Sequence, residues 1–226
     1  MTRHPSVLAE ADTPRGSLSL RRRGEVIELR VNGVFVMDTA ETGSEEALAR
    51  LALAASSAPA RVLVAGLGLG STLRSVLADD RVEQVTVVEL EPDLVAWLRA
   101  DVVPGGTRLL DYPRVEVQVG DVRDAIRDLP AGSVDVVLLD VDNGPDHLVH
   151  ADNRALYQRD FVHRLAAALA DDGVLAVWSM SRANELEAIL RQVFEDVRTT
   201  AHVVRLRERD EAYWILVASR PIASAA

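Results

Sequence analysis

Short apolar runs alternate with amphipathic stretches along most of the chain. Five runs are too short for a buried helix and have the composition of buried strands. They lie at residues 62–65, 84–90, 114–119, 134–140 and 173–179. Each run is followed by a segment in which apolar residues recur three and four positions apart, a spacing that predicts a helix. The repeated strand–helix order predicts an α/β fold with a doubly wound, mostly parallel sheet.

The end of the chain departs from this rhythm. Two further β-like runs, 202–207 and 212–217, are separated only by residues 208–211, which leave no room for a helix. Such neighbours are expected to pair as an antiparallel hairpin. The prediction is therefore a seven-stranded sheet that contains one reversed strand.

The beginning of the chain alternates apolar and polar residues instead of alternating strands with helices. Asn32-Gly33 stands between two β-like runs, and this dipeptide is a strong hairpin signal. We expect a small N-terminal β-hairpin unit over residues 17–40, preceded by a loose tail over 1–16. The α/β domain is expected to occupy residues 41–226.

Composition narrows the classes of function. The 226 residues carry 25 Lys and Arg against 35 Asp and Glu, a net charge of −10, which disfavours nucleic acid as a partner and is compatible with a cationic substrate. The absence of cysteine excludes disulfides and thiolate chemistry. There is no run of membrane-spanning length and no apolar leader core, so we expect a cytoplasmic protein with no membrane partner.

A glycine-rich turn follows the first strand of the α/β region. Gly66, Gly68 and Gly70 separate that strand from the next helix, and glycine there lets the backbone approach a nucleotide closely. Glu89 closes the following strand, about 20 residues further on, where an acid accepts hydrogen bonds from ribose hydroxyls. The combination predicts an adenosine-containing ligand.

Further acids follow the later strands. Asp140 ends an apolar strand, where a carboxylate is costly without a partner, so a role in a site is favoured over a structural one. Asp121 follows the third strand and could equally cap the next helix. Asp142 is followed by His147 and His150, which raises the alternative of a metal site. Because carboxylate-rich loops are usually solvated, no metal is expected.

The closing hairpin is similar to the class I S-adenosylmethionine methyltransferase fold. Within that fold the residues resemble spermidine synthase and its polyamine aminopropyltransferase relatives, over about residues 28–219. The segments that carry the resemblance are 31–34, 66–70, 88–93, 120–121, 139–145 and 156–161. The resemblance implies transfer from S-adenosylmethionine or its decarboxylated form to a small amine, and a homodimer.

The resemblance also implies roles for individual residues. The donor-binding residues that it implies are Gly66, Gly68, Gly70, Glu89, Asp121 and Val122. Asp140 is the implied catalytic acid/base, and Asp142 and Glu46 are the implied substrate-binding residues. A carboxylate at the tip of a strand suits this chemistry, because it can orient an ammonium group and take its proton.

Several positions depart from the family pattern. Leu69 stands where the family has an aspartate that selects the decarboxylated donor, and Met37 stands for a glutamine. Residues 44–46 read Ser-Glu-Glu for Tyr-His-Glu, so only Glu46 is retained, and the loop at 208–211 is short. An S-adenosylmethionine-dependent small-molecule methyltransferase is therefore one alternative. A non-catalytic nucleoside-binding or assembly module is another.

Overall fold

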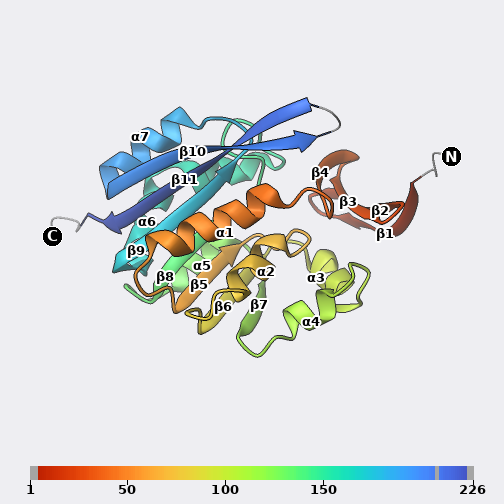
Figure 1. The fold of residues 1–226 in the computed structure, drawn as a ribbon, viewed down its shortest axis with the longest axis horizontal. Helices are drawn as coiled ribbons and strands as arrows, with labels where there is room; N and C mark the ends of the chain where they lie inside the picture. The colour runs from red at the N-terminus through yellow and green to blue at the C-terminus, as the bar shows by residue number, and fades with distance from the viewer. Residues whose placement is uncertain (1–4, 207–208, 223–226) are drawn as a thin grey trace.

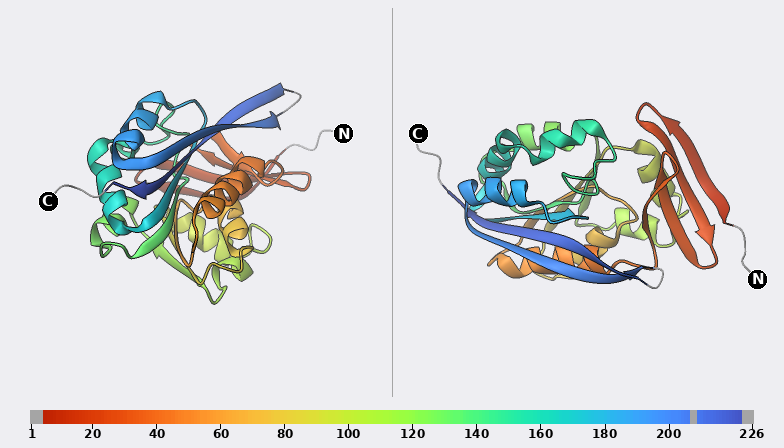
Figure 2. Two further views of the ribbon diagram at one scale, coloured as in Figure 1. Left: turned by 60° about the vertical axis from the view of Figure 1, so that its left-hand side comes forward. Right: turned by 90° about the horizontal axis from the view of Figure 1, so that it is seen from above.

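The computed structural model describes residues 5–206 and 209–222. A seven-stranded sheet between two layers of helices forms the body of the molecule, and a four-stranded antiparallel sheet stands at one end of it (Figure 1). Seen from above, the small sheet stands at the end of the α/β body that lies away from the C-terminus (Figure 2). The molecule thus combines a mostly parallel α/β body with a small antiparallel sheet.

The large sheet confirms the predicted topology. Its strands are β5 (Arg61–Ala65), β6 (Gln84–Glu89), β7 (Val115–Val119), β8 (Val134–Leu139), β9 (Leu169–Ser179), β10 (Phe194–Leu206) and β11 (Arg209–Pro221). They lie in the order β10-β11-β9-β8-β5-β6-β7. β11 pairs antiparallel with both β9 and β10, while β5, β6, β7, β8 and β9 pair in parallel.

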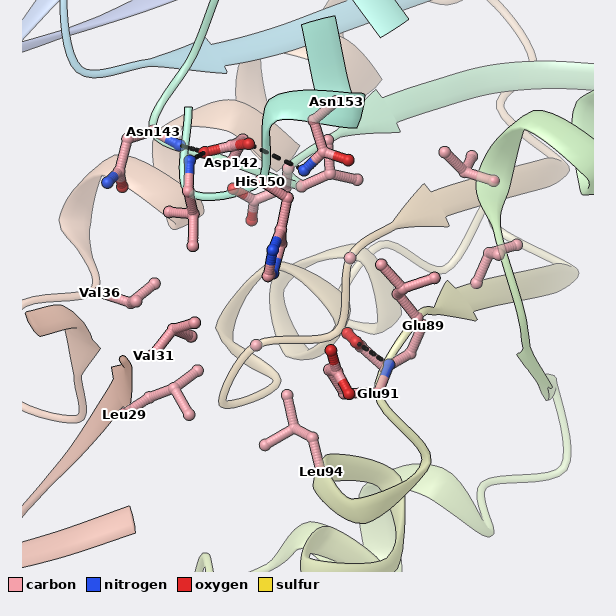
Figure 3. A pocket seen from close by; sticks show the side chains of 18 of the residues that line it. Leu29, Val31, Val36, Glu89, Glu91, Leu94, Asp142, Asn143, His150 and Asn153 are labelled. Carbon is pink, nitrogen blue, oxygen red and sulfur yellow. Dashed lines mark hydrogen bonds between the residues drawn. The ribbon is translucent and has the colours of Figure 1, made fainter. Parts of the chain in front are cut away.

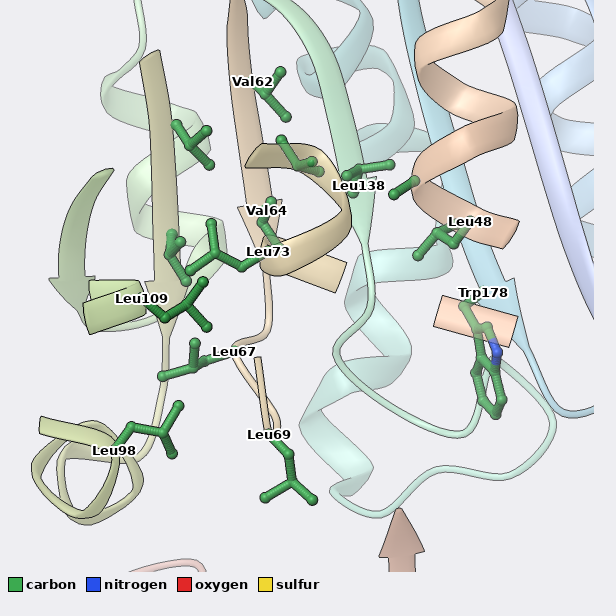
Figure 4. Close-up of a cluster of buried hydrophobic side chains, with 14 of the residues drawn as sticks. Leu48, Val62, Val64, Leu67, Leu69, Leu73, Leu98, Leu109, Leu138 and Trp178 are labelled. Carbon is green, nitrogen blue, oxygen red and sulfur yellow. The ribbon is translucent and has the colours of Figure 1, made fainter. Parts of the chain in front are cut away.

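Helices cover both faces of this sheet. They are α1 (Gly43–Ala55), α2 (Ser71–Leu77), α3 (Pro92–Arg99), α4 (Gly106–Leu110), α5 (Val122–Asp128), the 3-10 helix η1 (Ala151–Tyr157), α6 (Arg159–Ala168) and α7 (Asn184–Val193). Along β5 the side chains alternate between two cores. Val62 and Val64 pack with α1 to α4 (Figure 4), whereas Leu63 and Ala65 pack with α5 to α7. A parallel sheet that is buried on both faces requires such continuous apolar strands.

The N-terminal unit is larger than predicted. It contains β1 (Ser6–Thr13), β2 (Gly16–Arg23), β3 (Val26–Val31) and β4 (Val34–Asp38), in that spatial order. The hairpin turn lies at Asn32 and Gly33, both with positive φ (51° and 74°), as the sequence predicts. The expected tail at 1–16 is wrong for residues 6–13, which pair antiparallel with β2. This pairing satisfies backbone groups that β2 would otherwise expose at an edge.

Two further expectations need correction. The C-terminal hairpin is much longer than the apolar runs indicated, because both strands extend well beyond them. The short loop expected at 208–211 falls partly outside the described residues, and its last three residues belong to β11.

Candidate active site

A pocket lies between the carboxyl ends of the parallel strands and the inner face of the small sheet (Figure 3). The predicted site residues that line it are Gly66, Gly68, Glu89, Asp121, Val122, Asp140 and Asp142. The small sheet contributes an apolar wall made of Leu18, Leu29, Val31, Val36 and Met37. The fold therefore gathers acids from the ends of three strands, β6, β7 and β8, opposite an apolar surface.

The glycine turn is held in place by close backbone contacts. A Cβ atom on Gly66, whose φ is +92°, would lie 2.1 Å from the carbonyl oxygen of Asp140. A Cβ on Gly68 would lie 2.6 Å from the sulfur of Met37. Glycine therefore allows the turn to meet both β8 and the small sheet. Gly70 is the N-cap residue of α2 and is not among the residues that line the pocket.

Glu89 ties the glycine turn to the loop after β6. The amide of Leu67 donates to Oε2 and the amide of Glu91 donates to Oε1, each at 2.8 Å. The side chain is buried, and this burial raises the pKa of Glu89, while the two amides oppose the shift. Since each carboxylate oxygen has two lone pairs, both oxygens keep capacity to accept hydrogen bonds from a ligand.

Asp121 caps a helix as well as lining the pocket. Its Oδ1 accepts a hydrogen bond from the amide of Arg123 at 2.8 Å, at the N-terminus of α5. The Arg123 guanidinium also pairs with this carboxylate and holds the pKa of Asp121 below its usual range. Asp121 therefore caps α5, which is one of the two roles that the sequence left open. A ligand contact by Asp121, and by the neighbouring Val122, stays a prediction.

The carboxylate of Asp142 faces its own loop. It accepts hydrogen bonds from the backbone amides of Asn143 and Val149, and from the side-chain amide of Asn153 at 2.8 Å (Figure 3). These bonds hold the loop after β8 in one conformation. Its predicted role in substrate binding stays a prediction.

Asp140 stands directly after β8, beside the glycine turn. Its amide donates to the carbonyl of Ala65 at 2.9 Å, and its Oδ2 accepts from the hydroxyl of Thr72 at 2.7 Å. Burial raises the pKa of Asp140 to about 6, against the opposing effect of the Thr72 hydroxyl. A carboxylate that titrates near neutrality is suited to accept a proton from a substrate.

Glu46 and Glu45 point to different surfaces of α1. Glu46 is exposed, accepts a hydrogen bond from the Thr42 hydroxyl at 2.8 Å and lines a second, separate depression. Glu45 is only 7% exposed, lines the pocket and accepts from the Ser44 hydroxyl at 2.6 Å. Burial raises the pKa of Glu45 to about 7, and the negative charge of Asp140 adds to the shift. The pocket thus contains a carboxylate that the sequence prediction missed.

A signal for Glu45 was nevertheless present in the sequence. Counting along a helix, Leu48, Ala49 and Ala52 lie three, four and seven positions after Glu45, and all are buried. Glu45 therefore falls on the apolar face of α1. An acid on that face needs an explanation, because burying a carboxylate is costly.

The acids of the pocket do not form a recognisable metal site. Within the described residues, no group of three or more His, Cys, Asp or Glu side chains is arranged to hold a metal ion. His150 projects into the pocket, between the loop of Asp142 and Glu89 (Figure 3), whereas His147 is not among the lining residues.

Comparison with known proteins agrees with this geometry. The family model described as spermine/spermidine synthase domain matches residues 41–208. Polyamine aminopropyltransferase 2 of Pseudomonas aeruginosa is 33% identical over 165 residues, which are 68% of this chain and 45% of that protein. The polyamine aminopropyltransferase of Aeropyrum pernix is 28% identical over 207 residues, which are 86% of this chain and 62% of that protein.

The structural comparison supports the fold. A crystal structure of spermidine synthase in complex with the transition-state analogue AdoDATO matches with a TM-score of 0.81 at 20% identity, covering 94% of this chain and 73% of that one. The chain spans about half the length of the curated relatives that it matches. From the extent of the family match and the shared fold, the chain belongs to the spermine/spermidine synthase domain family.

Proposed function

We propose that this protein transfers an aminopropyl group from decarboxylated S-adenosylmethionine to a small amine. One observation carries the proposal: Asp140, with a pKa of about 6, lines the same pocket as the glycine turn and Glu89. Relatives named as polyamine aminopropyltransferases support the choice of this reaction. The acidic pocket suits a donor and an acceptor that are both cationic.

In the proposed reaction, the amine nitrogen of the acceptor attacks the aminopropyl methylene carbon that is bonded to the sulfonium sulfur. The electrons of the breaking carbon–sulfur bond stay on sulfur, which leaves as the neutral thioether of methylthioadenosine. The leaving group therefore needs no proton. The attacking nitrogen must lose one, and Asp140 is the acceptor that we propose. Holding the two reactants in line supplies much of the remaining rate.

The donor would lie across the ends of β5, β6 and β7. Backbone at Gly66 and Gly68 is open to the pocket, and Glu89 has free lone pairs for the ribose hydroxyls. Asp121 and Val122 line the adjoining wall, where we propose that the adenine binds. This arrangement directs the sulfonium towards Asp140.

Replacing Asp140 by asparagine tests the proposal. Removing a general base typically costs a factor of about 100 to 10,000 in rate. We expect Asp140→Asn to lower kcat by at least about 100-fold, measured as methylthioadenosine released from decarboxylated donor and a diamine. Affinity for methylthioadenosine, measured by calorimetry, should stay nearly unchanged.

The matched control is Asp152→Asn, because Asp152 is an exposed acid of η1 that does not line the pocket. This variant should retain wild-type turnover. Turnover retained by Asp140→Asn would contradict the role given to Asp140. Nucleoside binding without any product in the wild-type protein would instead favour the non-catalytic alternative.

A methyltransferase is the second candidate, and one feature favours it. Leu69 is 2% exposed and packs in the core, so the glycine turn carries no carboxylate that would select a decarboxylated donor. Mass spectrometry of the acceptor distinguishes a methyl from an aminopropyl addition when each donor is supplied separately. A methylated product from S-adenosylmethionine would replace the first proposal with this one.

The cellular location, the oligomeric state and the partners of the protein are also proposals. None of the helices in the described part of the chain is long and apolar enough to cross a bilayer. On the family resemblance we propose a cytoplasmic homodimer that acts on small molecules and does not bind nucleic acid. Light scattering of the purified protein tests the oligomeric state.

A further inference from the structure

Six acidic residues line the pocket, and their contacts divide them into two groups. Four are already engaged within the protein. Glu91 and Asp121 form ion pairs with Arg15 and Arg123, with nitrogen–oxygen distances of 2.6 and 2.5 Å. Glu89 and Asp142 accept hydrogen bonds from backbone amides, as described above. Groups of the protein itself therefore already neutralise or solvate these four carboxylates.

Among the described residues, the other two, Glu45 and Asp140, have no arginine partner and accept no hydrogen bond from the amide of another residue. Among the described side chains neither forms an ion pair, and the side chain that donates to each is a single hydroxyl, of Ser44 and of Thr72 respectively. The two carboxylates are near enough for the charge of Asp140 to act on Glu45. A buried charge without a cationic partner is costly, so the pair favours a cation that enters from outside.

The pocket that contains Glu45 also has an aromatic side chain in its lining. Trp178 lines the pocket, and its ring lies 4.9 Å from that of Tyr213, centroid to centroid. The charge of Glu45 reaches Tyr213 and helps to raise the pKa of its hydroxyl, although burial contributes more. Aromatic rings and a carboxylate without a cationic partner, in the same pocket, favour the binding of alkylammonium groups.

We propose that Glu45 determines the charge of the ligand that this end of the pocket accepts. It binds a primary ammonium on a short alkyl chain, and it repels a carboxylate at the same place. The inference deepens the proposed function and rests on it, because it assigns donor selection to α1 rather than to the glycine turn. At the separations found within one pocket, a second negative charge is strongly unfavourable.

Three nucleosides form a graded series for this test. Methylthioadenosine has no charged chain, decarboxylated S-adenosylmethionine ends in an ammonium, and S-adenosylmethionine carries both an ammonium and a carboxylate. Their dissociation constants should be measured by calorimetry for the wild-type protein and for Glu45→Gln. Glutamine keeps the size of the side chain and an oxygen that can accept from Ser44, so the fold should persist.

We expect the wild-type protein to bind the decarboxylated donor about tenfold or more tighter than S-adenosylmethionine, since hydrogen bonds to charged groups are worth this much. Glu45→Gln should weaken binding of the decarboxylated donor about tenfold and reduce its preference over S-adenosylmethionine. Methylthioadenosine affinity should change less than about twofold, because the neutral nucleoside does not use the charge. Glu45→Asp, which keeps the charge, should retain part of the preference.

Asp152→Asn is again the control, because Asp152 is an exposed acid that does not line the pocket. It should behave as the wild-type protein. A separate titration with 1,4-diaminobutane in the presence of methylthioadenosine identifies the source of the ammonium. If Glu45→Gln weakens binding of the diamine, Glu45 binds the ammonium of the acceptor. If it weakens binding of the donor alone, Glu45 binds the ammonium of the donor.

An unchanged preference in Glu45→Gln, or equal weakening of all three nucleosides, would overturn the role of Glu45. Wild-type protein that binds S-adenosylmethionine as tightly as its decarboxylated form would overturn it as well. These outcomes leave the transfer reaction in place. Wild-type protein that binds none of the three nucleosides would contradict the proposed function itself.

Discussion

The two halves of the pocket use acidic residues in opposite ways. In the half next to β6 and β7, the carboxylates of Glu89 and Asp121 are held by backbone amides or by an arginine. In the half next to α1, Glu45 and Asp140 receive side-chain donation only from hydroxyls and form no ion pair with any described residue. The first arrangement stabilises a preformed surface. The second keeps charge available for a ligand at the expense of stability.

The largest expected effect on stability concerns the half of the pocket next to β6 and β7, where protein groups hold the carboxylates. Glu89→Gln replaces one acceptor oxygen with an amide NH₂, which then faces a backbone N–H. We expect the free energy of unfolding to fall by about 2–3 kcal/mol. The buried N–H that loses its partner, next to a second weakened bond, costs more than is gained by removing a carboxylate whose pKa burial raises. Urea denaturation measures this loss. Glu83→Gln, at an exposed site just before β6, is the control and should unfold like the wild-type protein.

In the other half of the pocket, the corresponding substitution, Glu45→Gln, should raise the free energy of unfolding instead of lowering it. Burial raises the pKa of Glu45 from 4.5 to about 7, so its protonated form favours folding. That contribution is fully present below pH 4.5 and is lost as the pH rises through about 7. Glu45→Gln stays neutral, and we expect it to be more stable than the wild-type protein by roughly 1–2 kcal/mol at pH 8.

At pH 5 the difference between Glu45→Gln and the wild-type protein should be small. Urea denaturation at both pH values measures the change. Asp140 and Glu41 are the other acids that act on Glu45, and both remain in the variant. Glu46→Gln should show no such dependence on pH. Destabilisation by Glu45→Gln at pH 8 would mean that the two halves do not differ as described.

The smallest expected effect concerns the contact between the two sheets. Arg15, in the turn between β1 and β2, donates to Glu91 and to the carbonyl of Leu90. Because its side chain is 33% exposed, Arg15→Met should cost less than about 1 kcal/mol of stability. Donor affinity should fall a few-fold if this pair seats the small sheet over the pocket. Arg22→Met, at an exposed position of β2, is the control.

Much of the α/β body could be predicted because its strands are continuous apolar runs bounded by glycine, proline or acids. β5, β6 and β8 are fully or largely buried, so their pattern is strong. β1 was missed because the strand is an edge strand with a mixed pattern, and its pairing with β2 depends on the rest of the sheet. Tertiary context of that kind leaves little local signal.

The candidate site was predicted in part for a similar reason. Residues at the carboxyl ends of strands meet at one edge of the sheet, so Glu89, Asp121 and Asp140 converge as expected. Glu46 and Gly70 do not line the pocket, because the phase of α1 and the start of α2 turn them elsewhere. The hydrogen-bond partners that separate Asp142 from Asp140 depend on loop geometry, which sequence spacing does not fix.

The apolar wall supplied by β2, β3 and β4 lies outside the stretch that matches the family model. The reactive groups and the shape of the cavity are therefore encoded in separate parts of the chain. Changes to Leu29, Val31 or Val36 could alter the length or bulk of the molecule admitted while leaving the acids untouched. Among relatives, divergence of acceptor preference should then concentrate before residue 41, in a segment that a family match does not report.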